Sequence, residues 1–135
     1  MARGAVYYHS QFKFHDGAVG EKRFVILNEP KSDEPYLVLK TTSKLHGKTY
    51  IPGCNPDRGV FFLAANLESM FELDTLVQLR EIFPFTQQEI LTASLKDKTL
   101  NHLGDLSDIC VRQIINCIRK LKDDIRQDYF VLVTR

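Results

Sequence analysis

The sequence predicts an α+β fold in which a small antiparallel β-barrel is followed by helices. Residues 1–65 hold several short apolar runs separated by turn-forming residues, which is typical of strands. The most regular helical periodicity comes after residue 105, so strands precede helices without the alternation of parallel α/β proteins. A length of 135 residues is that of one domain, which we expect to cover residues 1–135.

Strands are predicted where β-branched and aromatic residues are bounded by glycine, proline or charged turn residues. These segments are 5–14, 22–27, 36–42, 59–65 and 75–82. The intervening segments 15–21 and 43–48 are polar and contain glycine, so both are predicted to be loops.

Two helices are predicted after the last of these strands. Thr86 and Glu89 form the capping-box pattern of a short helix. A longer helix is predicted to follow Ser107, its expected N-cap, with apolar residues at three- and four-residue steps as far as Ile125. The apolar ending Tyr129–Val133 is β-prone, and we expect it to add a strand or to dock on a partner.

Composition argues against membrane and metal-binding proteins. No stretch approaches the roughly 18 apolar residues of a membrane span, and the N-terminus lacks the apolar core of a signal peptide, so we expect a cytoplasmic protein. The cysteines Cys54, Cys110 and Cys117 are not expected to form a disulfide framework, and the seven-residue spacing of the last two predicts buried apolar side chains on one helix face. No histidine and cysteine spacing fits zinc, and we expect no metal and no cofactor.

Positive charge is concentrated in the first part of the chain. Residues 1–60 carry nine lysines and arginines against six aspartates and glutamates, whereas residues 61–135 carry nine against eleven. A basic excess favours an anionic ligand, although an asymmetry of this size also occurs in proteins that bind nothing charged.

The candidate site combines a cation at the start of one predicted strand with hydroxyls at the end of the next. Lys22 and Arg23 open the strand 22–27, and Thr41 and Thr42 close the strand 36–42. If the two strands are neighbours, a guanidinium and two hydroxyls meet at one rim of the sheet, where they suit a phosphodiester. Further residues expected to contact a phosphate backbone at this rim are Lys22, Thr41, Ser43, Lys44 and Lys48. The alternative is a set of solvated surface lysines and turn-forming hydroxyls.

His15 and Asp16 precede the glycine-containing loop 17–20. Histidine is the side chain whose ordinary pKa lies nearest neutrality, so His15 is a candidate general acid or base, with Asp16 beside it as a further contact to the ligand. An ordinary loop histidine is the alternative reading.

The order of four sequence blocks resembles that of the PemK/MazF (Kid, CcdB-like) toxins of bacterial type II toxin–antitoxin systems. The blocks are Arg3–Tyr8, Gly17–Leu27, Leu37–Ser43 and Asp74–Leu79. The chain departs from the family pattern at Ala5, where the family has an acidic residue, and at Phe24, where it has proline.

The resemblance implies an SH3-like barrel, a homodimer and an antitoxin protein that blocks the site. It also implies metal-independent endoribonuclease activity on single-stranded RNA, with Arg23 and Thr42 (or Thr41) as active-site residues. Arginine would hold the phosphate oxygens while the RNA 2′-OH attacks the adjacent phosphorus. Two other functions stay open: a non-catalytic toxin of this fold that inhibits a protein such as DNA gyrase through its C-terminal residues, and a non-toxic barrel that binds RNA or protein.

Overall fold

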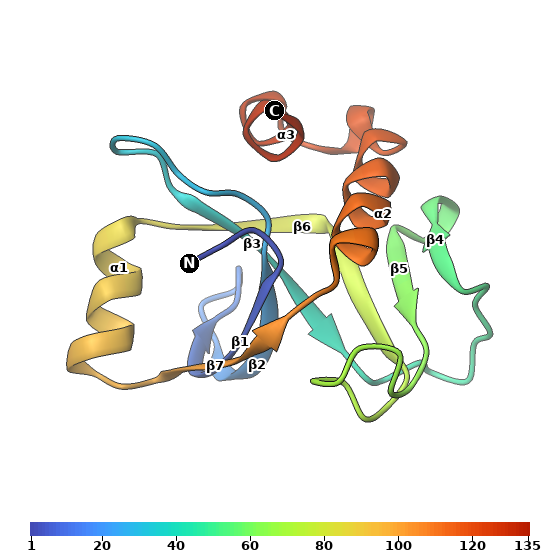
Figure 1. Cartoon of the computed structure of the whole chain (residues 1–135), viewed down its shortest axis with the longest axis horizontal. Helices are drawn as coiled ribbons and strands as arrows, with labels where there is room; N and C mark the ends of the chain where they lie inside the picture. The colour runs from blue at the N-terminus through green and yellow to red at the C-terminus, as the bar shows by residue number, and fades with distance from the viewer.

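All seven strands of the chain belong to one antiparallel sheet, and the computed structural model describes residues 1–135 (Figure 1). The strand order is β4-β5-β6-β3-β2-β1-β7. The strands are β1 (Ala5–Lys13), β2 (Val19–Ile26), β3 (Tyr36–Thr42), β4 (Gly53–Asn55), β5 (Val60–Leu63), β6 (Thr75–Phe85) and β7 (Leu100–Asp105). The α+β class is confirmed, but the sheet does not close as the predicted barrel requires, because β4 and β7 remain its two edges.

The five strands predicted from the sequence are all present, as β1, β2, β3, β5 and β6. The two edge strands were not predicted. β4 has three residues, and β7 has the sequence Leu-Asn-His-Leu-Gly-Asp, in which apolar residues do not alternate regularly. Each of these strands is stabilised by its partner: β4 pairs with β5, and β7 pairs with β1. Such pairing cannot be read from the residues of the short strand itself.

The first two helices begin where the capping residues predict. In α1 (Gln87–Leu91), the Thr86 hydroxyl accepts from the Glu89 amide at 3.0 Å, and the Glu89 carboxylate accepts from the Thr86 amide at 2.9 Å. The chain then continues into a π-helical segment, Thr92–Lys96. In α2 (Asp108–Arg119), the Ser107 hydroxyl accepts from the Cys110 amide at 3.2 Å. Each cap satisfies an amide that has no partner inside its helix.

The C-terminal segment is a helix, α3 (Gln127–Thr134), so the predicted strand at Tyr129–Val133 is wrong. A short apolar run fits a strand and a buried helix equally well, and its β-branched residues biased the prediction. Asp128 lies in the first turn of α3, where a carboxylate is stabilised by the helix dipole. Val133 is fully buried, so the helix is held by packing.

The sheet has a hydrophobic core on each face. Alternate residues of β2 point to opposite faces: Val25 belongs to a core of 20 buried residues, and Phe24 and Ile26 belong to a core of eight. The larger core includes side chains from α2 and α3, whereas the smaller one includes Ile90 of α1. In Figure 1, α1 accordingly lies at one end of the molecule, whereas α2 lies in the other half, beside β5.

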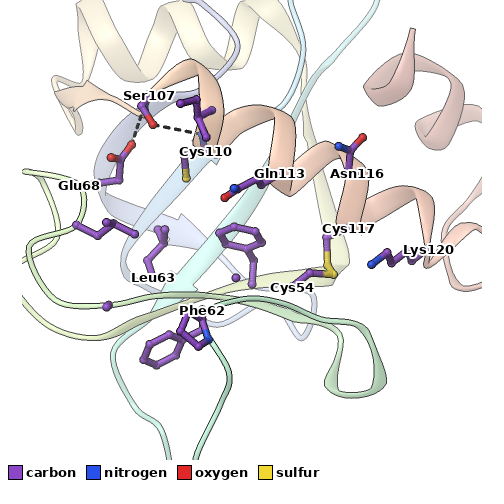
Figure 2. Close-up of a pocket in the computed structure, with 16 residues that line it drawn as sticks. Cys54, Phe62, Leu63, Glu68, Ser107, Cys110, Gln113, Asn116, Cys117 and Lys120 are labelled. Atoms are coloured by element: carbon purple, nitrogen blue, oxygen red, sulfur yellow. Dashed lines mark hydrogen bonds between the residues drawn. A yellow bond between two sulfur atoms is a disulfide. The ribbon is translucent and has the colours of Figure 1, made fainter.

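A disulfide joins Cys54 of β4 to Cys117 of α2, with their Cα atoms 5.5 Å apart (Figure 2). The prediction that Cys117 is an unpaired apolar side chain is therefore wrong. The prediction considered only the helical spacing between Cys117 and Cys110. The actual partner, Cys54, lies 63 residues from Cys117 in the sequence, on β4, which pairs with β5. Cys110 is a buried free cysteine, as predicted.

None of the helices combines the length and the apolar character that crossing a membrane requires.

Candidate functional site

The candidate site forms where β1, β2 and β3 lie side by side. Phe24 of β2 pairs with Lys40 of β3, which brings Arg23 beside Thr41. Arg23 in turn pairs with Tyr8 of β1. Because residues paired across antiparallel strands project to the same face, Tyr8, Arg23 and Thr41 belong to one surface of the sheet.

These residues line a cavity of about 530 Å³, which we call the basic cavity. Its lining residues are Tyr8, Glu21, Lys22, Arg23, Thr41, Thr42, Ser43, Lys44, Phe71, Leu73 and Thr75. Three of them are cations and one is a carboxylate, so the cavity carries an excess of positive charge. A cavity of this composition attracts an anion.

Arg23 presents a largely free guanidinium to the basic cavity. The side chain is exposed, and its single hydrogen bond runs from Nη1 to the Met70 carbonyl oxygen at 3.4 Å. No carboxylate lies within salt-bridge distance of it. The remaining N–H groups can therefore hold a phosphate through two parallel hydrogen bonds.

The two threonines at the end of β3 have different roles. The Thr41 hydroxyl is buried and donates to the Arg23 carbonyl oxygen at 3.1 Å, so it links β3 to β2. The Thr42 hydroxyl accepts from the Lys44 amide at 3.2 Å, which leaves its own proton available to a ligand. Thr42 is thus the hydroxyl that can donate to a phosphate oxygen.

Lys22 supplies a second cation. Its ammonium donates to the Thr41 carbonyl oxygen at 3.3 Å. Partial burial, followed by the nearby charges of Lys40 and Lys44, lowers the pKa of Lys22 below its usual value. An anion in the cavity would relieve this repulsion between like charges.

Three polar residues of the cavity, Tyr8, Glu21 and Thr75, were not among the predicted site residues. The Tyr8 phenol donates a hydrogen bond to the Glu21 carboxylate, and this bond is the main reason that the pKa of Tyr8 is raised. Glu21 falls in the segment 15–21, which the sequence predicts to be a loop, whereas in the structure β2 begins at Val19 and includes Glu21. The one available signal was its position two residues before Arg23 on the same strand, which places both side chains on one face.

Three predicted site residues lie outside the basic cavity. The His15 ring stacks on Phe83 at 4.0 Å between centroids and lines a separate cavity of about 430 Å³. The Asp16 carboxylate accepts from the Ala18 amide at 2.9 Å and stabilises the turn between β1 and β2. Lys48 is exposed in the segment between β3 and β4. The predicted residues that the structure does bring together are Lys22, Arg23, Thr41, Thr42, Ser43 and Lys44.

A larger cavity, of about 610 Å³, lies between α2 and the strands β4 and β5 (Figure 2). Nine of its sixteen lining residues are hydrophobic. Its thiol, Cys110, is not an activated nucleophile, because burial and then the charge of Glu68 raise the pKa of Cys110 to about 12. Glu68 itself accepts from the Ser107 amide at 2.5 Å. This apolar cavity therefore offers less chemistry than the smaller basic cavity.

Comparison of the chain with protein-family models and with curated proteins gives no match.

Proposed function

We propose that this protein is a metal-independent endoribonuclease that cleaves single-stranded RNA, with the basic cavity as its active site. The observation that carries the proposal is the presence of an Arg23 guanidinium without a carboxylate partner and an available Thr42 hydroxyl in one cavity. The order of the sequence blocks, which resembles that of PemK/MazF-like toxins, agrees with it.

The reaction begins with attack of an RNA 2′-OH on the adjacent phosphorus. Negative charge then grows on the two non-bridging oxygens of the phosphate. The Arg23 guanidinium stabilises that charge, and the Thr42 hydroxyl donates to the same group. Lys22 and Lys44 attract the neighbouring phosphates of the strand.

The proposal extends to the biological setting that the resemblance implies. The chain would be a toxin with an SH3-like fold, a homodimer in the cytoplasm, and would be neutralised by an antitoxin protein. If the protein binds RNA without cutting it, the alternative of a non-toxic RNA-binding protein is favoured instead.

The test is cleavage of a single-stranded RNA that contains every trinucleotide, in buffer with EDTA. We expect fragments that end in 2′,3′-cyclic phosphate, and no cut where the 2′-OH is replaced by hydrogen. Arg23→Ala should lower the rate about 100-fold or more, as loss of a charge-stabilising donor does. Arg112→Ala removes an exposed arginine of α2 outside the cavity and should not change it.

Cleavage that disappears in EDTA would contradict the mechanism. Cleavage that survives Arg23→Ala would contradict the site.

A further inference from the structure

We propose that Glu21 is the general base of this site and that Tyr8 is a positioning residue that orients its carboxylate. The inference rests on the proposed function, since it assigns a step of the same RNA cleavage. It starts from the pairing of a phenol and a carboxylate inside a cavity that is otherwise basic.

Glu21 is the sole carboxylate among the residues that line the basic cavity. Glu21 and Arg23 are two residues apart on β2, so their side chains project from the same face with Cα atoms about 7 Å apart. A ribose–phosphate unit can therefore meet both groups, with its phosphate at Arg23 and its 2′-OH at Glu21.

Tyr8 fixes the direction of the carboxylate. It lies opposite Arg23 on β1, and its hydroxyl donates to Oε2 of Glu21, which leaves Oε1 without a hydrogen-bond partner. Oε1 can accept the proton of the 2′-OH. Because the pKa of Tyr8 is raised, the phenol keeps its proton and remains a donor at neutral pH.

The cavity also holds a group that can protonate the leaving oxygen. Oε1 of Glu21 takes the 2′-OH proton while the 2′-oxygen–phosphorus bond forms. The bond from phosphorus to the 5′-oxygen breaks, and this oxygen takes a proton from the Lys22 ammonium. A lowered pKa makes Lys22 a better acid than an ordinary lysine. The step yields a 2′,3′-cyclic phosphate and a 5′-hydroxyl, and it needs no further reactant.

The first experiment compares cleavage rates of Glu21→Gln and Tyr8→Phe with that of the unaltered protein. General-base catalysis contributes about 100- to 10,000-fold, so Glu21→Gln should lower kcat at least 100-fold. Its affinity for an uncleavable RNA with a 2′-hydrogen at the cut site should stay equal or become tighter, because a negative charge is removed. Tyr8→Phe should lower kcat about 10-fold, and the double variant should be no slower than Glu21→Gln alone, since both act on one proton transfer.

Glu72→Gln is the matched control. Glu72 lies between Phe71 and Leu73, which line the cavity, yet its own exposed side chain does not. This variant makes the same charge change beside the site and should keep the full rate.

The second experiment uses an RNA with sulfur in place of the bridging 5′-oxygen at the cut site. A thiolate leaves without a proton, so this substrate should restore cleavage by Lys22→Ala but not by Glu21→Gln.

The outcomes separate this inference from the proposed function. Cleavage by the unaltered protein that is lost in Arg23→Ala but stays within threefold in Glu21→Gln overturns this inference alone. Restoration of Glu21→Gln by the sulfur substrate also overturns it. Absence of cleavage by the unaltered protein overturns both.

Discussion

The Thr41 hydroxyl donates a hydrogen bond to the backbone carbonyl oxygen of Arg23, 3.1 Å away. This bond links the end of β3 to the middle of β2, at the residue whose side chain lines the basic cavity. One threonine therefore supports the backbone of the site, while its neighbour Thr42 lines the cavity with its hydroxyl proton available.

Replacing each threonine by valine should separate these two roles. Thr41→Val removes the buried hydrogen bond to the Arg23 carbonyl oxygen, which should lower the free energy of unfolding by about 1–2 kcal/mol. Thr42→Val should lower it by less than about 0.5 kcal/mol but should slow RNA cleavage about 10-fold or more. Urea unfolding and cleavage rates measure the two effects. The assignment of roles is wrong if Thr42→Val cleaves normally.

Reduction of the Cys54–Cys117 disulfide should destabilise the protein. The closed loop spans 63 residues, for which chain entropy gives a loss of about 4 kcal/mol. Urea unfolding with and without dithiothreitol measures the difference. The double variant Cys54→Ser, Cys117→Ser has no disulfide to reduce. Its unfolding midpoint should therefore be the same with and without dithiothreitol. Equal midpoints for the unaltered protein in both buffers would show that the disulfide does not contribute.

Acid should weaken the contact between the β2–β3 loop and α3. The Arg135 guanidinium donates twice to the Glu34 carboxylate, at 2.6 and 2.8 Å, and the Lys31 amide donates at 2.8 Å. Led by the Arg135 bond, these contacts lower the pKa of Glu34 from 4.5 to about 2. Between these values the unfolded chain binds the proton more readily than the folded one, so stability falls as the pH decreases from about 4.5 to 2.

The measurement is unfolding by urea at a series of pH values. In Glu34→Gln, the free energy of unfolding should change less with pH between about 4.5 and 2. Glu29→Gln, which changes an exposed carboxylate nearby, should keep the pH dependence of the unaltered protein. An unchanged curve for Glu34→Gln would rule out this ion pair as the cause.

His15→Ala should leave RNA cleavage within about threefold of the normal rate. The ring lies on Phe83 and lines a cavity other than the basic one, so its loss should cost only about 0.5 kcal/mol of stability through the aromatic contact. Cleavage rates and urea unfolding of the variant check both expectations. If His15→Ala folds normally but no longer cleaves RNA, His15 takes part in catalysis and this expectation is wrong.

Features that depend on neighbouring residues could be predicted from the sequence. Thr86 and Ser107 cap helices because their side chains bind amides three residues away. Arg23 and Thr42 meet because consecutive strands of an antiparallel sheet commonly pair, which holds for β2 and β3.

Features that depend on distant pairing could not be predicted. The contact between Tyr8 and Glu21 depends on the register between β1 and β2, which the sequence alone does not reveal. The open sheet, the strand β7 and the Cys54–Cys117 disulfide likewise depend on contacts between segments far apart in the chain. The apolar residues of α3 fit either type of element until their packing against the core is known.

Cys110 can report the local unfolding that exposes α2. It is the one sulfhydryl left outside the disulfide, and its side chain is buried with its proton held firmly in place. Maleimide dyes should therefore not attach to native molecules in non-reducing buffer, and any labelling would count those that have exposed α2. For binding studies, a fluorophore can therefore be attached to a cysteine introduced at the surface, because Cys110 does not react in the native protein.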